Sequence, residues 1–542
     1  MGAQASESGS TPLNQRGVDR ATPYAYYALL LLVVANLFNY LDRNIVSALT
    51  TSIKAELHFT DAQIGFLLGT AFAVLYSVLG IPMGRIADAL SRTRLMACGL
   101  ALWSAMTALS GAATGFASLG ASRVGVGVGE ATVNPVSHSL LCDYFPARNR
   151  SAVLGCYLAS VHLGIGAALV VGGLLIQHWS SWCGRFPGNA CALTSWRASF
   201  LIVGAPGILL AVLIALLREP ARPKTHVLPP ARKIIGSELS AAIPPFTVFR
   251  LAKLGGRRAV IANLLFMILL ALAAIAVARL TGDWAQWIAV SIGVYCVATW
   301  AQVLKYSDAP LYALTFGCPT FMFSMFGGAL LTCFVGTVAT WAVPYAMRTL
   351  HADAGHVGVA LGIAQLGTAV TSVVVGGFVT DWWKRRDPRA PVWIALIALC
   401  VPIPMLFALL SAKTLGGFVA AFCALTLFSM SWAGSFAALV QDLVLVRMRG
   451  AAAAIFSLVM VLTSSGIGPY WTGKISTLTG SLTTGLYSLL VFVPGAAVLL
   501  LLAAARLRHE TTEARYSRAR SAGEIIPGFH QEAAVAPSVA GA

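Results

Sequence analysis

Apolar residues in this chain are gathered into long runs separated by short polar segments. Between Leu95 and Arg123, for example, no Asp, Glu or Lys and no other Arg interrupts the sequence. A bilayer offers no water to backbone groups, so a run of about 20 apolar residues crosses it as an α-helix. We expect fourteen such spans, at residues 25–50, 62–84, 95–115, 118–142, 152–178, 197–217, 259–279, 284–304, 318–346, 357–380, 391–411, 415–438, 451–472 and 485–505. The pattern therefore predicts an all-α polytopic membrane protein.

The spans form two sets of six around an inserted pair. We expect a cytoplasmic N-terminal tail at residues 1–23, an N-terminal six-helix bundle at 24–217, a basic cytoplasmic linker plus an inserted transmembrane hairpin at 218–308, a C-terminal six-helix bundle at 309–507 and a disordered cytoplasmic tail at 508–542. The tail is expected to be disordered because its low hydrophobicity leaves little apolar surface to bury. Within the linker, residues 246–258 form either an amphipathic segment on the inner leaflet or part of a disordered connection.

Composition supports membrane insertion and sets the orientation. Hydrophobic residues make up 58% of the chain and charged residues only 11%, too few to cover a soluble protein. With the N-terminus inside, 28 of the 37 Lys and Arg residues fall on the cytoplasmic side of the predicted spans. This bias is the positive-inside rule, so the net charge of +17 reports topology rather than nucleic-acid binding. We expect a multi-pass protein of the inner (plasma) membrane with both termini in the cytoplasm.

One short pattern, Gly-x-x-x-Asp-x-x-x-Arg, occurs twice with identical spacing. Each copy ends a span and opens a short basic loop: Gly84, Asp88 and Arg92 in the first, and Gly377, Asp381 and Arg385 in the second. Glycine lets two membrane helices approach closely, and a carboxylate is stabilised at a helix N-terminus. We expect both copies to act as gating elements at the inner surface. Two homologous halves are the usual architecture of a secondary transporter.

Ionisable residues also lie inside two of the predicted spans. The first span contains Asp42 and Arg43, and the fourth contains Arg123 and Glu130 on one helical face. Such residues are costly in a bilayer and usually face a cavity or one another. Because the two spans run in opposite directions, the pairs Asp42–Arg123 and Arg43–Glu130 are both geometrically possible.

These charges have two interpretations. One is a static ion-pair network that locks two helices together. The other is proton coupling by Glu130 and Asp42, because burial favours the neutral form of a carboxylic acid and a proton can then be carried across. In that interpretation a freed arginine meets an anionic substrate group. The candidate substrate-binding residues are Arg43, Arg123, Asn39, Tyr40, His138 and Trp341.

The repeated loop motif resembles the signature of the major facilitator superfamily. The usual form of that signature is Gly-x-x-x-Asp-Arg/Lys-x-Gly-Arg, and this chain keeps it only in part. Ala89 stands where a basic residue is usual, and Ser91 stands where Gly is usual. The resemblance implies a major facilitator fold, with two six-helix bundles around a central cavity.

The charged spans narrow the resemblance to the Spinster branch of that superfamily. The similar segments are Asn39-Tyr40-Leu41-Asp42-Arg43, Arg123-x-x-x-Gly127-x-Gly129-Glu130-Ala131, Trp196-Arg197-x-x-Phe200 and Trp341-x-x-Pro344-x-x-x-Arg348. This branch is known to carry lysolipids and sphingoid phosphates and is thought to be proton-linked. The resemblance therefore implies an anionic head group near the two arginines. The inserted hairpin departs from the usual twelve-helix plan.

Two cysteines differ from the others, which lie in or beside predicted spans. Cys183 and Cys191 share a loop that the topology places outside the cell, where a disulfide and two free thiols are both compatible with the sequence. We find no metal-ligand spacing, no nucleotide-binding loop and no catalytic triad. We therefore expect no cofactor, no metal and no enzymatic activity.

The sequence predicts a secondary active transporter that works as a monomer in the bilayer. Its expected partners are protons and a small molecule, and its mechanism is alternating access. The favoured substrate is an amphiphilic or anionic solute of the lysolipid or sphingoid kind. One alternative is transport of a soluble organic anion or sugar acid, and a second is a non-transporting membrane sensor.

Overall fold

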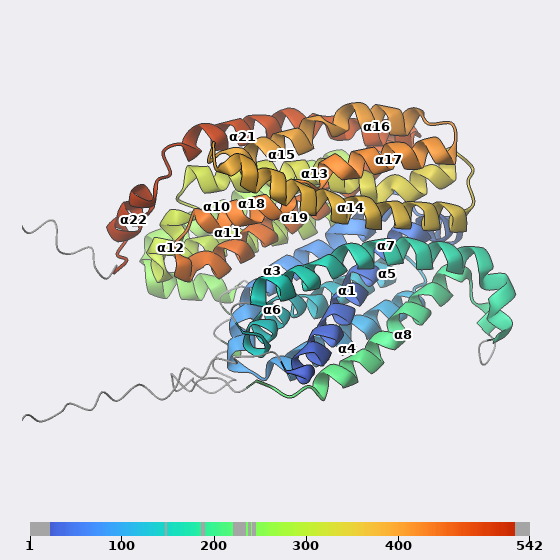
Figure 1. Ribbon diagram of the computed structural model, residues 1–542, viewed down its shortest axis with the longest axis horizontal. Helices are drawn as coiled ribbons and strands as arrows, with labels where there is room; N and C mark the ends of the chain where they lie inside the picture. The colour runs from blue at the N-terminus through green and yellow to red at the C-terminus, as the bar shows by residue number, and fades with distance from the viewer. Residues whose placement is uncertain are drawn as a thin grey trace, which may run out of the picture.

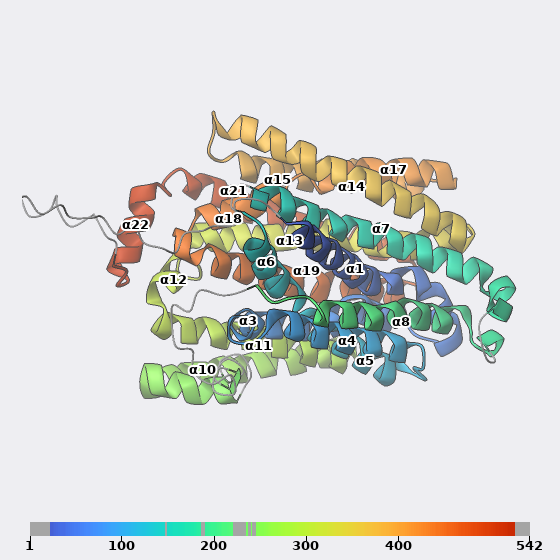
Figure 2. The ribbon, with the colours of Figure 1, turned by 60° about the horizontal axis from the view of Figure 1, so that its bottom comes forward.

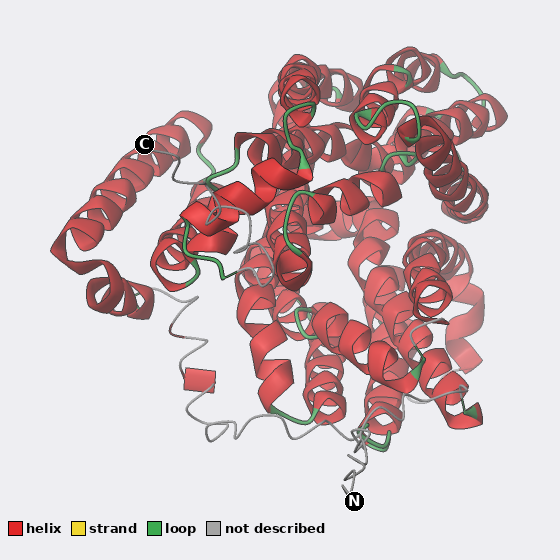
Figure 3. Ribbon diagram, turned by 60° about the vertical axis from the view of Figure 1, so that its left-hand side comes forward, coloured by secondary structure: helices red, strands yellow, loops and turns green. Residues whose placement is uncertain are grey.

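The computed structural model describes residues 22–146, 149–185, 190–220, 235–236, 240 and 245–525 of the chain. Within these ranges the regular structure is entirely helical, as Figure 3 shows, and no strand occurs there. The helices run mostly along the longest axis of the molecule (Figure 1). One end of that axis carries a disulfide loop and the other carries the last helix, and we refer to them as the disulfide end and the tail end.

The first half of the chain folds as a bundle of long helices joined by short turns. In chain order these elements are α1 (Pro23–Leu57), α2 (Asp61–Gly65), the π-helical turn η1 (Phe66–Thr70), α3 (Ala71–Ala89), α4 (Arg92–Ser110), α5 (Phe116–Glu130), α6 (Val133–Tyr144), α7 (Arg150–Trp182) and α8 (Ser195–Ala215). The segments α2, η1 and α3 follow one another without a break and together make one span. A short 3-10 turn at Cys183–Arg185 and another at Ala190–Ala192 lead from α7 towards α8.

The second half repeats this arrangement beside the first (Figures 1 and 2). Its elements are α12 (Ala309–Leu314), α13 (Pro319–Thr349), α14 (Ala354–Lys384), α15 (Ala390–Cys400), α16 (Pro402–Ser411), α17 (Leu415–Ser429), α18 (Ala433–Asp442), the 3-10 turn η5 (Val446–Met448), α19 (Arg449–Thr479), α20 (Leu482–Tyr487), the 3-10 turn η6 (Ser488–Val491), α21 (Phe492–Leu507) and α22 (Thr512–Ser521).

Between the two halves the chain makes a helical hairpin of α10 (Phe246–Thr281) and α11 (Trp284–Ser307). A left-handed residue, Gly256 with φ of 67°, breaks α10 into two helical pieces. Most of α10 is exposed outside the protein, as expected for a helix in lipid. Asn263 fixes α10 to α11, because its amide donates to Thr299 and Gln302 and accepts from Tyr295.

The predicted fold class is confirmed. Twelve helical segments among the described residues are long and apolar enough to cross a membrane by length and composition. The two remaining predicted spans correspond to α4 and to the broken pair α5–α6, which fall outside that set of twelve. The chain is therefore a multi-pass α-helical membrane protein.

The tail differs from the sequence-based expectation. Residues 512–521, expected to be disordered, form helix α22, which packs near α12. Glu510 anchors this helix by accepting hydrogen bonds from Arg518 and Thr320. Burial raises the pKa of Glu510, but these hydrogen bonds outweigh it and hold the pKa below its ordinary value. Docking on the second half therefore supplies the stability that the polar sequence of α22 lacks on its own. Residues 526–542 lie outside the described part of the chain.

Candidate functional site

An ion pair inside the first half joins the two predicted charged spans. Nη2 of Arg43 on α1 lies 2.9 Å from Oε2 of Glu130, the last residue of α5. The Glu130 side chain is completely buried, whereas 17% of the Arg43 side chain is exposed. The structure thus forms one of the two pairs that the sequence allowed. The Arg43 side chain therefore has some contact with solvent, whereas the Glu130 side chain has none.

Three aromatic rings surround the guanidinium of Arg43. Its central carbon lies 4.9 Å from the ring centre of Tyr40, 4.0 Å from that of Phe72 and 4.9 Å from that of Tyr76. A cation over an aromatic face gains about 0.5–2 kcal/mol, more where water is excluded. The three rings and the carboxylate of Glu130 therefore jointly fix the position of the Arg43 guanidinium. We call Tyr40, Phe72 and Tyr76 the aromatic cage.

The second predicted pair is not formed, and this corrects the sequence-based expectation. Arg123 is fully buried, and its guanidinium donates to the backbone carbonyls of Asp42 at 3.2 Å and Arg43 at 3.4 Å. The carboxylate of Asp42 instead accepts a hydrogen bond from Thr107 on α4 at 3.2 Å. Arg123 thus binds the α1 backbone beneath the aromatic cage. In this conformation its guanidinium is engaged with the protein.

Two buried guanidinium atoms of this network, Nε of Arg43 and Nε of Arg123, have no hydrogen-bond partner among the described residues. An unsatisfied buried polar atom costs about 1–3 kcal/mol. A purely structural network would be expected to satisfy more of its members. The pattern fits a site whose charged groups exchange partners.

The remaining substrate candidates lie in two places. His138 on α6 is exposed, and its ring contacts that of Tyr157 on α7 at 5.5 Å. Trp341 on α13 is fully buried instead, and it donates to the backbone carbonyl of Pro469 on α19 at 3.2 Å. Trp341 therefore packs two helices of the second half together. In this conformation it is not available to a solute.

A polar chain beside the aromatic cage was not singled out from the sequence. Tyr157 donates to the side-chain oxygen of Asn134 at 3.2 Å, and the amide of Asn134 donates to the hydroxyl of Tyr76 at 3.1 Å. This chain leads from the cage to His138 through Tyr157. The available signal was the presence of Asn134 in a predicted span, where polar residues are costly and often functional.

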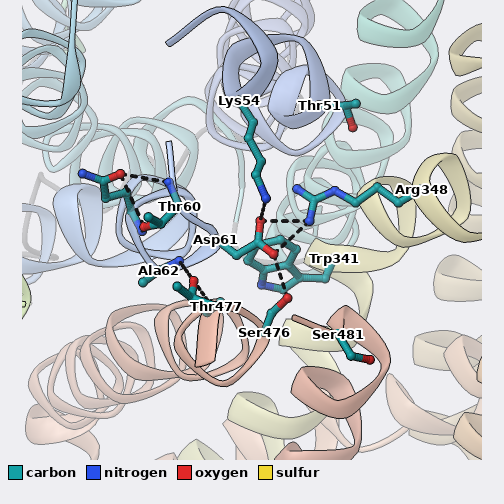
Figure 4. A network of polar contacts seen from close by, with 12 residues as sticks. Thr51, Lys54, Thr60, Asp61, Ala62, Trp341, Arg348, Ser476, Thr477 and Ser481 are labelled. Atoms are coloured by element: carbon teal, nitrogen blue, oxygen red, sulfur yellow. Dashed lines mark hydrogen bonds and ion pairs between the residues drawn. The ribbon is translucent and has the colours of Figure 1, made fainter. Parts of the chain in front are cut away.

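A second ionic cluster, also missed from the sequence, links the two halves at the disulfide end (Figure 4). Asp61, the first residue of α2, accepts from Lys54 on α1 at 2.6 Å. It also accepts from Arg348 on α13 at 2.8 Å and from Ser476 on α19 at 2.7 Å. One carboxylate thus binds two cations, one from each half. We call Asp61, Lys54, Arg348 and Ser476 the Asp61 cluster.

Close helix packing between the halves also lies towards the disulfide end. A Cβ atom on Gly65 would come within 2.3 Å of the Pro469 carbonyl on α19. A Cβ atom on Gly173 of α7 would come within 2.6 Å of the Ala354 carbonyl on α14. Small residues permit such contacts between membrane helices. The disulfide end is therefore closed, by glycine packing and by the Asp61 cluster.

Towards the tail end the same helices lack such contacts. A Cβ atom on Gly80 of α3, Gly155 of α7 or Gly367 of α14 would meet no atom within 4 Å. The described glycines that bring the two halves into close contact are thus concentrated on one side of the molecule. This asymmetry is typical of a transporter that is closed at one end and open towards the other.

The first copy of the gating motif is tied within its own half. Arg92 is buried and forms ion pairs with Asp143 of α6 at 2.5 Å and with Glu219 after α8 at 2.7 Å. Burial raises the pKa of Glu219, but hydrogen bonds from Arg92 and Thr93 outweigh it and lower the pKa from its ordinary value. Gly84 and Asp88 belong to α3, but the surroundings of Gly84 and the side chain of Asp88 lie outside what the structure describes.

In the second copy of the gating motif, the prediction that Gly377 lets two helices approach closely is wrong. A Cβ atom there would meet nothing within 4 Å, whereas a Cβ atom on the neighbouring Gly376 would come within 2.1 Å of the Ser431 carbonyl. Consecutive residues of a helix point about 100° apart, so only one of the two can face the next helix. Asp381 and Arg385 are both exposed. The ion pair at this position joins Lys384 to Asp442 at 2.7 Å.

Cys183 and Cys191 form a disulfide at the disulfide end. Of the two states that the sequence left open, the structure contains the bonded one. Among the described residues no group of three or more His, Cys, Asp or Glu side chains could hold a metal ion.

Comparison with known proteins places this geometry in a family. Residues 32–332 match the model of the Major Facilitator Superfamily, and the chain belongs to that superfamily of membrane transporters. An "MFS-type efflux pump" of Mycolicibacterium smegmatis is 27% identical over 89% of this chain and 90% of its own length. The mouse "Sphingosine-1-phosphate transporter SPNS2" is 24% identical over 83% of this chain and 69% of its own length. The "Probable L-galactonate transporter" of Escherichia coli is 28% identical over 34% of this chain and 37% of its own.

Among solved structures, a bacterial homologue of the human lysosomal transporter Spinster in an inward-facing, occupied conformation has the same fold. The TM-score is 0.68 at 22% identity, covering 91% of this chain and 99% of that one. The resemblance to Spinster proteins expected from the sequence is thus confirmed. The chain is a transporter of the major facilitator superfamily, similar to Spinster proteins.

Proposed function

We propose that this protein transports an anionic amphiphile, of the lysolipid or sphingoid kind, by proton-coupled alternating access. The observation that carries the proposal is the Arg43–Glu130 pair. It combines a fully buried carboxylate with a partly exposed arginine side chain inside the first half. One partner is placed to hold a proton out of water and the other to meet an anion.

Neutralising Glu130 is the coupling step. A hydrogen bond to a charged group stabilises a protein by about 1.5–3 kcal/mol, and protonation of the carboxylate removes most of that contribution. Arg43 is then held by the aromatic cage alone. The cage stabilises a cation without neutralising its charge, so the guanidinium can bind a phosphate or carboxylate head group. Release of the anion allows Glu130 to lose its proton and to recover its partner.

The Asp61 cluster is the gate that this cycle must open. Separation of the halves at the disulfide end would remove Arg348 and Ser476 from Asp61 and leave only Lys54 beside it. Arg92, in contrast, is bound within the first half, and we infer that it keeps that half rigid during the movement. The motif copies at residues 84–92 and 377–385 then act at the tail end, where the halves lack close glycine contacts.

We infer that the disulfide end faces the outside of the cell and that both termini are cytoplasmic. The excess of Lys and Arg near the tail end favours this orientation. The disulfide favours the same orientation, because disulfides form and persist in oxidising compartments. The protein would act as a monomer in the plasma membrane, open to the cytoplasm in the conformation described above.

A second candidate substrate is a soluble organic anion such as a sugar acid. The observation that favours it is that a guanidinium binds any carboxylate or phosphate, whether or not an alkyl chain is attached. The similarity to a probable L-galactonate transporter over about a third of the chain supports the same class. Only the first candidate carries an apolar tail. A panel of solutes with and without such a tail therefore separates the two candidates.

The test is uptake into proteoliposomes with and without an inward-acid pH gradient. The panel contains a fluorescent lysophosphatidic acid, a sphingoid phosphate and the sugar acid galactonate, and Glu130→Gln is run beside the native protein. We expect gradient-driven movement of the first two solutes and none in the variant. Movement of galactonate alone would favour the second candidate. Absence of any movement under every gradient would refute transport and favour a sensor.

A further inference from the structure

The inserted hairpin covers the seam between the two halves. Helix α11 packs against α3 and η1 of the first half and against α19 of the second (Figure 2). The continuous span α2–η1–α3 and helix α19 also meet at the disulfide end, where Gly65 packs against the Pro469 carbonyl. An insertion at this place is therefore in contact with both moving bodies, and its attachment to each of them can be compared.

The hairpin is attached firmly to the second half. Asp283, in the turn of the hairpin, forms an ion pair with Lys474 at 2.7 Å and accepts from the Tyr470 hydroxyl at 2.8 Å. Trp287 packs edge-on against the ring of Tyr470, with 5.8 Å between centres. At its other end α11 leads directly into α12. There Asp308 pairs with Arg447 of η5 at 3.2 Å.

Among the described residues, the polar contact of the hairpin with the first half runs through Thr70 and Gln286. The hydroxyl of Thr70, in the π-helical turn η1, lies 2.7 Å from Oε1 of Gln286 on α11 and 2.8 Å from the Gly466 carbonyl on α19. The amide of Gln286 donates to the same Gly466 carbonyl at 2.8 Å. Both side chains are buried. Thr70, Gln286 and Gly466 thus form a closed triangle across the seam.

We propose that the hairpin moves with the second half and that Gln286 is a positioning residue that latches it to Thr70. The latch holds the disulfide end closed and must break whenever that end opens. Breaking it parts the Thr70 hydroxyl from Oε1 of Gln286 and from the Gly466 carbonyl, while the Gln286 amide keeps its bond to Gly466 because both move with the second half. The irregular backbone of η1 places Thr70 at this point, as π-helical turns often do at functional positions.

The latch is distinct from the Asp61 cluster and does not depend on the substrate. It consists of neutral groups, so salt and pH leave it unchanged, whereas an ionic gate responds to both. The inserted hairpin thereby sets how readily the disulfide end opens. Transporters of the usual twelve-helix plan have no equivalent element.

The experiment measures opening of the disulfide end without any substrate. Ser47 is buried and donates to the Thr340 carbonyl on α13, so it becomes accessible only when the halves separate there. Ser47→Cys is introduced into protein whose eight free cysteines are replaced by alanine. The purified protein is placed in nanodiscs, and its rate of labelling by a polar maleimide is recorded.

Gln286→Leu and Thr70→Val are compared with the matched control Gln302→Leu, which disrupts a hydrogen bond to Asn263 inside the hairpin. We expect each latch variant to raise the labelling rate about tenfold, as for a loss of about 1.4 kcal/mol. The double variant should label no faster than Thr70→Val alone, because that substitution already removes both contacts of Thr70 across the seam, to Gln286 and to Gly466. Labelling that is unchanged in both latch variants, or equally raised in Gln302→Leu, would overturn the proposal.

Discussion

Arg43 and Glu130 meet 2.9 Å apart, with the Glu130 side chain sealed from solvent and the Arg43 side chain partly exposed. The Arg92–Glu219 pair also joins a buried side chain to a partly exposed one, so the feature that sets the Arg43 pair apart is the aromatic cage around Arg43. A buried pair has no great advantage for stability over apolar residues of similar size. Its retention beside an aromatic cage is more readily explained by a function in transport.

Glu130→Gln is expected to abolish pH-driven transport and to leave the fold intact. The amide keeps the size of the carboxylate and can still accept a hydrogen bond from Arg43, but it cannot carry a proton. Uptake driven by an imposed pH gradient should fall to the level of empty vesicles, while exchange without a gradient persists. Glu513→Gln, at an exposed carboxylate on α22, serves as the control and should transport normally. Full gradient-driven uptake by Glu130→Gln would refute the carrier role.

Asp61→Asn is expected to weaken the closed state of the disulfide end. The substitution leaves Lys54 and Arg348 facing each other without a compensating carboxylate. A loss of about 2 kcal/mol, typical of a charged hydrogen bond, corresponds to roughly a thirtyfold shift in the opening equilibrium. Maleimide labelling of Ser47→Cys provides the measurement. Asp353→Asn removes an exposed carboxylate of the second half and should not change the rate; equal acceleration in that control would contradict the gate.

The Arg92–Glu219 pair predicts a pH dependence of stability outside the membrane spans. Because the pKa of Glu219 is lowered in the folded protein, its stabilising contribution is complete above the unfolded pKa of about 4.3. It is lost as pH falls through the folded value. Glu219→Gln should therefore lower the melting temperature at pH 7 by a few degrees, and the difference should shrink below about pH 4. Glu513→Gln, an exposed position on α22, is the control. A difference in melting temperature that grows on acidification would contradict this prediction.

The Cys183–Cys191 disulfide should stabilise the loop between α7 and α8. A bridge over a short loop contributes about 2–3 kcal/mol by restricting the unfolded chain. We expect a reducing agent to lower the melting temperature of the native protein and to have no effect on the double variant Cys183→Ala/Cys191→Ala. Cys156→Ala, at an exposed free cysteine, should behave like the native protein. Identical melting with and without reductant would contradict a stabilising bridge.

The helices and the central pair were predictable from the sequence because each depends on a local rule. Span positions follow from hydrophobic length, and the seven-residue spacing of Arg123 and Glu130 fixes one helical face. The partner of Arg123 was not predictable, since a guanidinium can bind backbone carbonyls as well as a carboxylate. The choice between Gly376 and Gly377 depends on helix rotation, which sequence spacing alone does not fix.

The Asp61 cluster was missed for a different reason. Asp61 stands at the boundary of a predicted span, where an acidic residue is unremarkable as a helix N-terminal residue. Its partners lie 7, 287 and 415 positions away in sequence. Only the packing of the two halves brings them together. Contacts that cross the seam, including that of Thr70 with Gln286 of the hairpin, could not be predicted from the sequence for the same reason.

Arg447 binds Asp308 at the exit of the hairpin and Glu524 just after α22. The end of the chain is therefore fastened to the second half by a residue that also holds the hairpin. Truncation ahead of residue 524 would remove Glu524 and leave Arg447 paired with Asp308 alone. Affinity tags and fluorescent reporters for purification or imaging are better appended beyond residue 525, where they leave that fastening in place.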